Sequence, residues 1–574
     1  MKKIPLLFIV LLSLNCLAQF SKTHYIPPLT TNSNAGVTPQ DHYIYISTPS
    51  ISNINFKIIQ IGGTTITGTV SKSTPYIYSI GSGENTQLFV PSSSTGLVIN
   101  KGFIIESEGL IYSSIRTNAG SGNQAGGLVT KGVSAFGKRF RAGAMLNSSN
   151  IVGLLNFFSV LATENNTSIT ISNIPNGTLL ANGTTFNGPF TINLNKNESY
   201  ILGINGNIGG NIIGALIESN KDVVVNSGSF GGTNDPSTAS GAGRDVGFDQ
   251  IVGSDKIGKE YIFIRGQGTT VLERVLIIAD EDNTEIYANG STTPITIIQA
   301  GQNYIFDGNA FVNNNLYVNT TKKVFAYQSI GGTASNANQN LFFVPPLNCS
   351  TPKIVDNIPQ INRIGNVNYD GVVNVVTENG ASVLINNLPI GVNPITITGN
   401  PDFVCYTVNG LYDNIAIKST KQVYVSYYGT RSAATYGGYY SGFDIKPELT
   451  IQNATTISGS CLPNITLTTT PDPDYTFQWL QNDTNILGQN SNSYIPSTPG
   501  YYQVKRSIPN CNTNNVSDKI PISNCPTDLD NDSIADNVDV DNDNDGITNC
   551  TESYGNLGID HSYGNIRIGN YSNS

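Results

Sequence analysis

The chain has 574 residues and a formal net charge of −10, with only 12% charged residues, and its length allows about three to five domains. Nine acids and no Lys or Arg fall within residues 525–552, so the rest of the chain is close to neutral. A nucleic-acid-binding function is disfavoured because it requires a basic surface. Disorder throughout is also disfavoured, since 39% hydrophobic residues can fill cores.

Residues 1–18 predict a signal peptide. Lys2 and Lys3 precede an apolar run over residues 4–14, and small residues at 16 and 18 fit cleavage before Gln19. The run is too short to span a bilayer, and no later segment contains the roughly 18 apolar residues of a membrane helix. We therefore expect a secreted or cell-surface protein without a membrane span; lipidation of Cys16 is the alternative.

Residues 19–446 contain an internal repeat of about 100 residues, with 19–130 as a diverged first copy and 131–446 as three further copies. Short polar turns followed by Val- and Tyr-rich strands recur in "ESEGLIYSSIRTNAG", "ESNKDVVVNSGSFGG", "NTTKKVFAYQSIGG" and "KSTKQVYVSYYGT". The third copy predicts seven strands: "EYIFIR", "VLIIAD", "TEIYA", "ITIIQ", "NYIFD", "LYVN" and "KVFAYQ". This count predicts an all-β fold of tandem sandwich-like units. The alternative is a β-propeller with blades of half this length.

A stretch rich in Gly, Ser and Ala follows each of these Val- and Tyr-rich strands. Equivalent loops of stacked repeats fall on one face, which is often the binding face. We predict ligand contacts at Arg244, Asp245, Asp249, Tyr436 and Tyr439, because Arg pairs with carboxylates and Tyr stacks on sugars or protein. The alternative is an ordinary loop with a local Arg–Asp pair and surface tyrosines.

Three segments resemble the N-terminal region of the IgG-Fc-binding protein family: "ATENNTSITI", "GRDVGFDQIVGSDKIGKEYIFIRG" and "NQNLFFVPPLNC". The resemblance covers roughly residues 130–445 and implies a bacterial surface protein with related modules. It fixes no binding residue, and binding of antibody Fc by this chain does not follow from it.

Residues 447–524 predict a further module, because "TFQWL" and "TPGYYQVKR" resemble strands of bacterial immunoglobulin-like domains. Trp479 is expected in its core. Export permits disulfides. Proximity along the chain favours the pairs Cys461–Cys511 and Cys525–Cys550. The alternative is free buried thiols, most plausible for Cys349 and Cys405.

Residues 525–552 carry oxygen-bearing side chains at the spacing of calcium-binding loops. Gly546 supplies the sharp turn of the second loop, which fits D-x-[DN]-x-[DN]-G-x5-E, whereas Ser533 replaces it in the first. The tandem aspartates resemble thrombospondin type 3 repeats. The predicted Ca²⁺ ligands are Asp528, Asp530, Asp532, Asp536, Asp539, Asp541, Asp543, Asp545, Asn549 and Glu552. Residues 553–574 are expected to begin a truncated or missing domain.

The function that these features favour is adhesion or binding, in which repeat loops meet an extracellular glycan or protein and calcium stiffens a C-terminal linker. An enzyme is disfavoured, because the three histidines are dispersed and no HExxH, GxSxG or GxxxxGK motif occurs. A passive calcium-dependent surface stalk is the main alternative. A glycoside-acting enzyme, which needs only two carboxylates, is the weaker one.

Overall fold

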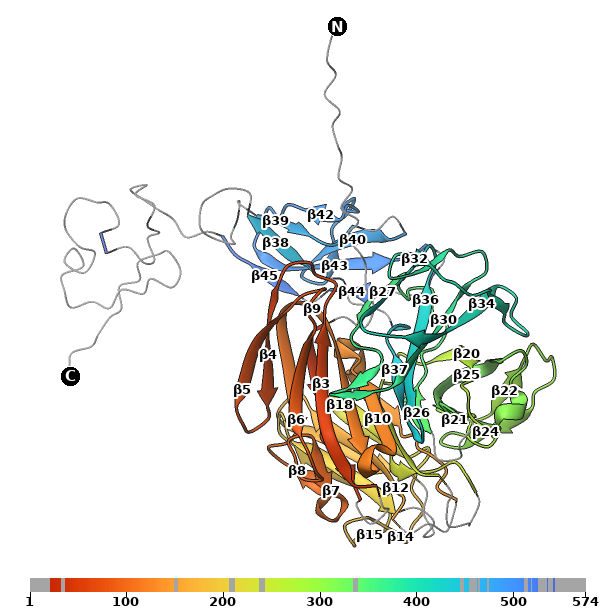
Figure 1. The fold of residues 1–574 in the computed structure, drawn as a ribbon. Coiled ribbons are helices and arrows are strands. Elements are labelled where there is room, and N and C mark those ends of the chain that lie inside the picture. The colour runs from red at the N-terminus through yellow and green to blue at the C-terminus, as the bar shows by residue number, and fades with distance from the viewer. Residues whose placement is uncertain are drawn as a thin grey trace, which may run out of the picture. The chain divides into compact units, whose positions relative to one another are not determined.

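The computed structural model is built from strands, with only short 3-10 turns besides them in the part of the chain that it describes. It describes residues 21–32, 37–148, 153–205, 212–236, 243–333, 339–443, 447, 449–453, 462, 465–471, 474–509, 511, 515–517, 519–524, 534, 540 and 541. The expected all-β fold is confirmed (Figure 1). The chain divides after Ile445 into a main unit and a C-terminal unit, which are treated separately.

Repeat 3 shows the architecture of the main unit most clearly. Its seven strands form one sheet, ordered β23-β22-β25-β21-β24, with β20 and β26 also paired to β25. Five strands fall where the sequence predicts them, but the predicted strands "LYVN" and "KVFAYQ" form one strand. The bounds are β20 Gly258–Ile264, β21 Arg274–Ala279, β22 Thr284–Ala288, β23 Thr296–Ile298, β24 Asn303–Phe306, β25 Asn315–Ile330 and β26 Asn340–Phe343.

The long strand β25 changes partners along its length instead of turning. Its first half pairs with β20 and β22, and its second half pairs with β21 and β26. The residues around Lys322 and Lys323 are exposed at this change, which makes the segment look like a turn in the sequence. One strand therefore belongs to two half-sheets.

Repeats 1 and 2 use the long strands β9 (Phe103–Ala119) and β18 (Leu216–Gly232) in the same way, and repeat 4 uses β35 (Ile415–Ser419) followed by β36 (Val423–Arg431). The half-sheets of repeat 1 enclose a core that includes Ile44 from β3 and Phe56 from β4. Each repeat of about a hundred residues thus consists of two half-sheets, which share one continuous strand in repeats 1 to 3 and are formed around two consecutive strands in repeat 4.

The remaining strands of these repeats have the following bounds. Repeat 1 contains β1 Ser21–Ile26, β2 Leu29–Thr31, β3 Pro39–Ser47, β4 Ile54–Gln60, β5 Thr65–Val70, β6 Tyr76–Gly81 and β7 Phe89–Pro91; β8 (Gly96–Val98) joins the sheet of repeat 2. Repeat 2 contains β11 Gly137–Arg141, β12 Leu155–Ala162, β13 Thr167–Ser172, β14 Thr178–Leu179, β15 Thr185–Phe186, β16 Phe190–Leu194 and β17 Ser199–Asn205. Repeat 4 contains β27 Ile354–Ile358, β28 Arg363–Ile364, β29 Val367–Asn368, β30 Asp370–Glu378, β31 Val383–Ile385, β32 Leu388–Pro389, β33 Ile395–Thr396 and β34 Phe403–Leu411.

Four strands, one from the end of each repeat, meet at the centre of the main unit: β10 (Gln124–Val129), β19 (Asp245–Ile251), β26 and β37 (Ala434–Tyr439). Their contacts form a closed cycle, from β10 to β19, β26, β37 and back to β10. In Figure 1, β10, β26 and β37 lie together between the red first repeat and the green third repeat. We call these four strands the central strands.

The C-terminal unit contains two small sheets around Trp479, which is fully buried and donates from Nε1 to the carbonyl of Ser491 at 2.8 Å. The predicted core position of Trp479 is confirmed. Tyr502 packs in the same core and donates to the carbonyl of Thr498 at 2.6 Å. The strands are β38 Thr450–Asn453, β39 Ile465–Thr468, β40 Thr476–Gln481, β41 Thr484–Asn485, β42 Ser493–Tyr494, β43 Gly500–Ser507, β44 Asn515–Val516 and β45 Ile520–Ile522.

The cysteines correct one expectation. Cys405, in β34, is a buried free thiol, as the alternative has it, whereas Cys349 is disulfide-bonded and does not fit that alternative. The difference follows from location, because Cys405 lies inside a hydrophobic core and Cys349 lies in an exposed segment after β26. Cys511 is also disulfide-bonded, while Cys461, Cys525 and Cys550 lie outside the described residues, so both predicted pairings remain predictions.

A buried histidine makes the stability of the main unit sensitive to mild acid. Burial lowers the pKa of His24 from 6.5 to about 4, so the folded state holds the neutral ring while the unfolded chain is protonated more readily. The contribution of His24 to stability is full above pH 6.5 and is lost as the pH falls towards 4. At pH 5 the loss is about 2 kcal/mol.

We expect His24→Gln in the mature chain to reduce the difference in unfolding free energy between pH 7 and pH 5 by about 2 kcal/mol. Urea denaturation at both pH values measures this. Comparing the variant with the wild type cancels the opposite contribution of Glu273, a buried carboxyl group whose pKa is raised to about 7. An unchanged pH difference would contradict the assignment.

Candidate functional site

The hairpins that lead into the central strands gather at one end of the main unit, which we call the loop end. Gly122, in the first hairpin, lies so close to the Arg431 guanidinium of the fourth that an added Cβ would come within 3.2 Å of it. Thr333 of the third hairpin donates to the carbonyl of Ser432 at 3.3 Å. Gln339, after the third hairpin, donates to the carbonyl of Gly243 in the second at 3.1 Å. The described residues of the four hairpins thus lie close to one another.

The loop end is held by a single buried carboxylate, that of Asp245 at the start of β19. It accepts backbone N–H groups from one residue of each repeat. The donors and N···O distances are Ala125 at 2.8 Å, Val246 at 2.9 Å, Gln339 at 3.1 Å and Thr435 at 3.1 Å. Burial raises the pKa of Asp245 well above its usual range, and these four donors oppose the shift. All four partners are donors, so the ionised carboxylate is the form that they satisfy.

A second buried cluster lies four residues further along β19, around Asp249. Asp249 forms an ion pair of 2.9 Å with Lys131, and the two side chains are 1% and 0% exposed. The Asp249 carboxylate also accepts the backbone N–H of Val129 at 3.2 Å and of Phe343 at 3.0 Å. Asp249 therefore links repeats 1, 2 and 3, and removing either charged partner would leave an uncompensated buried charge.

These placements correct the prediction that the ligand-contact residues belong to exposed loops. Asp245 and Asp249 lie in β19 and Tyr436 and Tyr439 lie in β37, and all four side chains are buried. The strands that carry them are inserted between repeats, so these polar groups satisfy the interior rather than the surface. Arg244, which precedes β19, is half-buried.

Arg116, in β9, links repeat 1 to repeat 4. This residue was not identified from the sequence. Its guanidinium lies over the rings of Tyr45, Tyr436 and Tyr427, at 4.1, 5.2 and 5.3 Å from their centroids. It donates to the carbonyls of Gln360, Arg363 and Pro359 at 2.6, 2.9 and 2.7 Å. A fully buried cation thus fixes the backbone of residues 359–363.

A concavity of about 520 Å³ opens beside this fixed segment, and we call it the repeat-4 pocket. It includes the ends of the fourth hairpin, so it lies at the loop end. Its lining residues are Asn362, Arg363, Asn368, Tyr369, Asp370, Tyr412, Thr430, Arg431 and Ser432. It combines two guanidiniums, one carboxylate and an exposed tyrosine, which is a set that can hold a polar ligand.

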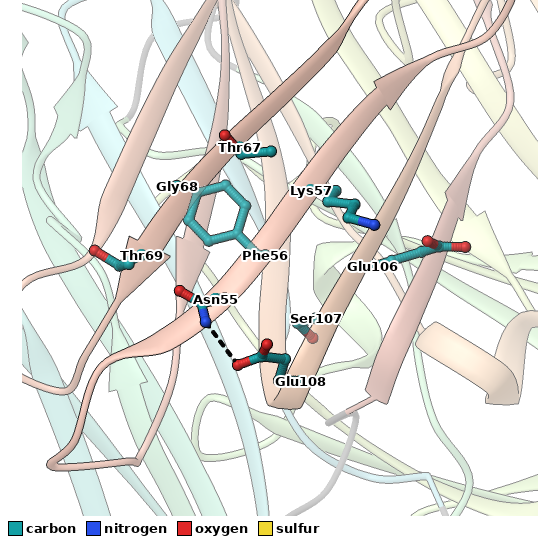
Figure 2. A pocket seen from close by; sticks show the side chains of 9 residues that line it. All are labelled: Asn55, Phe56, Lys57, Thr67, Gly68, Thr69, Glu106, Ser107 and Glu108. Carbon is teal, nitrogen blue, oxygen red and sulfur yellow. Dashed lines mark hydrogen bonds between the residues drawn. The ribbon is translucent and has the colours of Figure 1, made fainter. Parts of the chain in front are cut away.

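A second concavity, of about 540 Å³, lies on the outward face of β4, β5 and β9 in repeat 1 (Figure 2). Two rows of polar side chains cross these strands, with Lys57 opposite Glu106 in one row. In the other row Asn55 donates to Glu108 at 2.8 Å. Both rows are exposed, so this face is a polar sheet surface and serves below as the comparison site.

Metal ligation is not seen within the described ranges, where no group of three or more His, Cys, Asp or Glu side chains is placed to hold an ion. Of the predicted calcium ligands, only Asp541 is described; the other nine lie outside the described residues. The calcium site therefore remains a prediction.

Tandem β repeats whose hairpins gather at one end have the architecture of a protein that offers loops to a partner. The chain belongs to the IgG Fc binding protein family, whose model matches residues 127–429, more than half of its length. The match runs from β10 of repeat 1 to β36 of repeat 4 and so spans all of repeats 2 and 3. The family is one of binding proteins of the extracellular type rather than of enzymes.

The other comparisons add little. No curated protein matches the chain. A solved structure, Salmonella alpha-2-macroglobulin reacted with methylamine, is 8% identical with a TM-score of 0.15; the match covers 90% of this chain and 47% of that one, so this chain spans about half of that protein's length. In the described part of the chain, no helix has the length and apolarity needed to cross a membrane.

We expect Asp245→Asn to destabilise the main unit by about 2–4 kcal/mol, because an amide presents its own N–H groups to two of the four backbone donors. Asp402→Asn is the matched control; Asp402 is exposed, and its replacement should change stability by less than about 0.5 kcal/mol. Denaturant unfolding of both variants measures the difference. Equal stabilities would show that the carboxylate does not hold the repeats together.

Proposed function

We propose that the mature chain, after removal of residues 1–18, is exported and binds an extracellular glycan or protein through its loop end. The observation that carries this proposal is the gathering of hairpins from four repeats around one buried carboxylate. A rigid interior supports loops that are free to differ in sequence, and this is how repeat scaffolds present binding surfaces. The family's name supports a protein partner, and valency would multiply weak contacts.

The experiment is an array of glycans, mucins, matrix proteins and antibody Fc probed with the mature chain. The loop end is blocked by Ser432→Cys carrying a polyethylene glycol chain, and Thr69→Cys carrying the same chain is the matched control on the outward face of repeat 1. We expect saturable binding that Ser432 modification abolishes and Thr69 modification leaves unchanged. No binding to any class, or equal loss in both, would overturn the proposal and favour a passive stalk.

We further propose that the acidic segment 525–552 binds Ca²⁺ and stiffens the chain beyond residues 447–524, which we take to form an immunoglobulin-like module. The support is the spacing of its aspartates, since alternate oxygens on a tight loop can surround one hard cation. Nine acids in 28 residues also repel one another unless a cation is bound.

Calorimetric titration of the mature chain should detect Ca²⁺ binding with a Kd of about 0.1–1 mM, the range of extracellular modules. Substituting Asp541, Asp543 and Asp545 by Asn should remove the stronger site, because these residues belong to the loop that contains Gly546. Glu106→Gln with Glu108→Gln is the control acidic pair. An affinity and heat of binding that the triple substitution leaves unchanged would contradict the assignment.

A further inference from the structure

The repeat-4 pocket has a floor that is fixed from two sides. From inside, the carbonyl of Arg363 accepts from Arg116 Nη1 at 2.9 Å and from the Tyr45 hydroxyl at 3.2 Å, and the Tyr436 hydroxyl donates to the carbonyl of Ile361 at 2.6 Å. These three donors hold the backbone of residues 361–363, while the side chain of Arg363 stays exposed. The pocket is therefore preorganised at the residue that carries one of its two cations.

From the other side, the turn that follows β34 is bound to the same segment. Ile361 N donates to the carbonyl of Asp413 at 2.8 Å, and Asp413 N donates to Oδ1 of Asn362 at 3.0 Å. Gln360 N donates to Oδ1 of Asn414 at 3.0 Å. This network fixes the backbone of the turn that presents Tyr412, whose side chain is 57% exposed.

The charges of the lining side chains point to an anion. Arg363 and Arg431 are opposed only by Asp370 among the residues that line the pocket, so the lining is positive by one charge in a chain whose net charge is −10. Both guanidiniums are exposed and can pair with a carboxylate or sulfate by two parallel hydrogen bonds.

The uncharged lining points to a sugar as the carrier of that anion. Asn368 and Ser432 are exposed and carry an amide and a hydroxyl group, which match sugar hydroxyls. Tyr412 offers an exposed aromatic face on which a sugar ring can lie. A lipid or an apolar peptide requires a mostly apolar lining, whereas this pocket has one exposed aromatic ring among polar groups.

We propose that the repeat-4 pocket binds a saccharide bearing a carboxylate or sulfate, with Arg363 and Arg431 on the anion and Tyr412 under the ring. This inference rests on the proposed function and specifies the ligand class at one part of the loop end. Asp370 lowers the affinity for the anion and excludes ligands of higher charge density by repulsion.

The test uses the mature chain and three probes: sialyllactose, lactose 3′-sulfate and neutral lactose. We expect binding of one or both anionic probes and not of lactose, with affinity that falls as salt is raised. Arg363→Ala and Arg431→Ala should each weaken it about tenfold. Tyr412→Ala should weaken it several-fold, and Lys57→Ala, on the comparison site, should have no effect.

Asp370→Asn distinguishes recognition from folding, because it should strengthen binding of the anionic probes several-fold while a merely structural residue would not. Lactose binding as strong as that of the anionic probes, or affinity unchanged in both arginine variants, would overturn the inference. Failure of all three probes would overturn it as well. If the array above still shows ligand binding that is blocked at Ser432, the proposed function stands without the anionic saccharide.

Discussion

The main unit depends on one interaction, the acceptance of backbone N–H groups from four repeats by the Asp245 carboxylate. Those groups lie where the central strands begin or turn, so they have no complete set of strand partners there, and burying them unpaired would cost about 1–3 kcal/mol each. One anion with two oxygens meets all four donors. Each repeat ends on the same acceptor, so the position of each hairpin is tied to the other three.

This constraint explains why the interior of the main unit contains many polar side chains. Asp249 with Lys131, and Arg116 with its three tyrosines, are further polar junctions between repeats. Apolar packing within each repeat supplies most of the stabilisation but is not directional. The directional groups at the junctions fix how the repeats meet, and that in turn fixes the loops at the surface.

Much of this fold could be predicted from the sequence. The repeat of about 100 residues, the strands of repeat 3 and the core position of Trp479 follow from local patterns of turn residues and β-branched residues. The continuity of β25 could not be predicted, because the exposed lysines at its midpoint resemble a turn, and only the exchange of strand partners keeps the chain extended.

The candidate site was harder to predict for a related reason. Asp245 and Asp249 stand in a segment rich in Gly, which suggests a loop, and their burial depends on strands from three other repeats. A signal was present: in "DVGFDQI" the charged residues recur four apart, on one face of a strand that also carries Phe248 and Ile251. Charges at that spacing in such a strand indicate a polar junction, not an exposed loop.

The repeat-4 pocket shows how the interior and the surface are coupled. Arg116 belongs to repeat 1 and is fully buried, yet it holds the carbonyl of Arg363, whose side chain lines the pocket in repeat 4. No local pattern around Arg363 could reveal this, because the two residues are 247 positions apart in the chain. A lining side chain on a fixed backbone loses less entropy on binding than one on a free loop. The buried Arg116 guanidinium therefore stabilises the junction between repeats 1 and 4. It also fixes the backbone that carries the exposed Arg363 guanidinium.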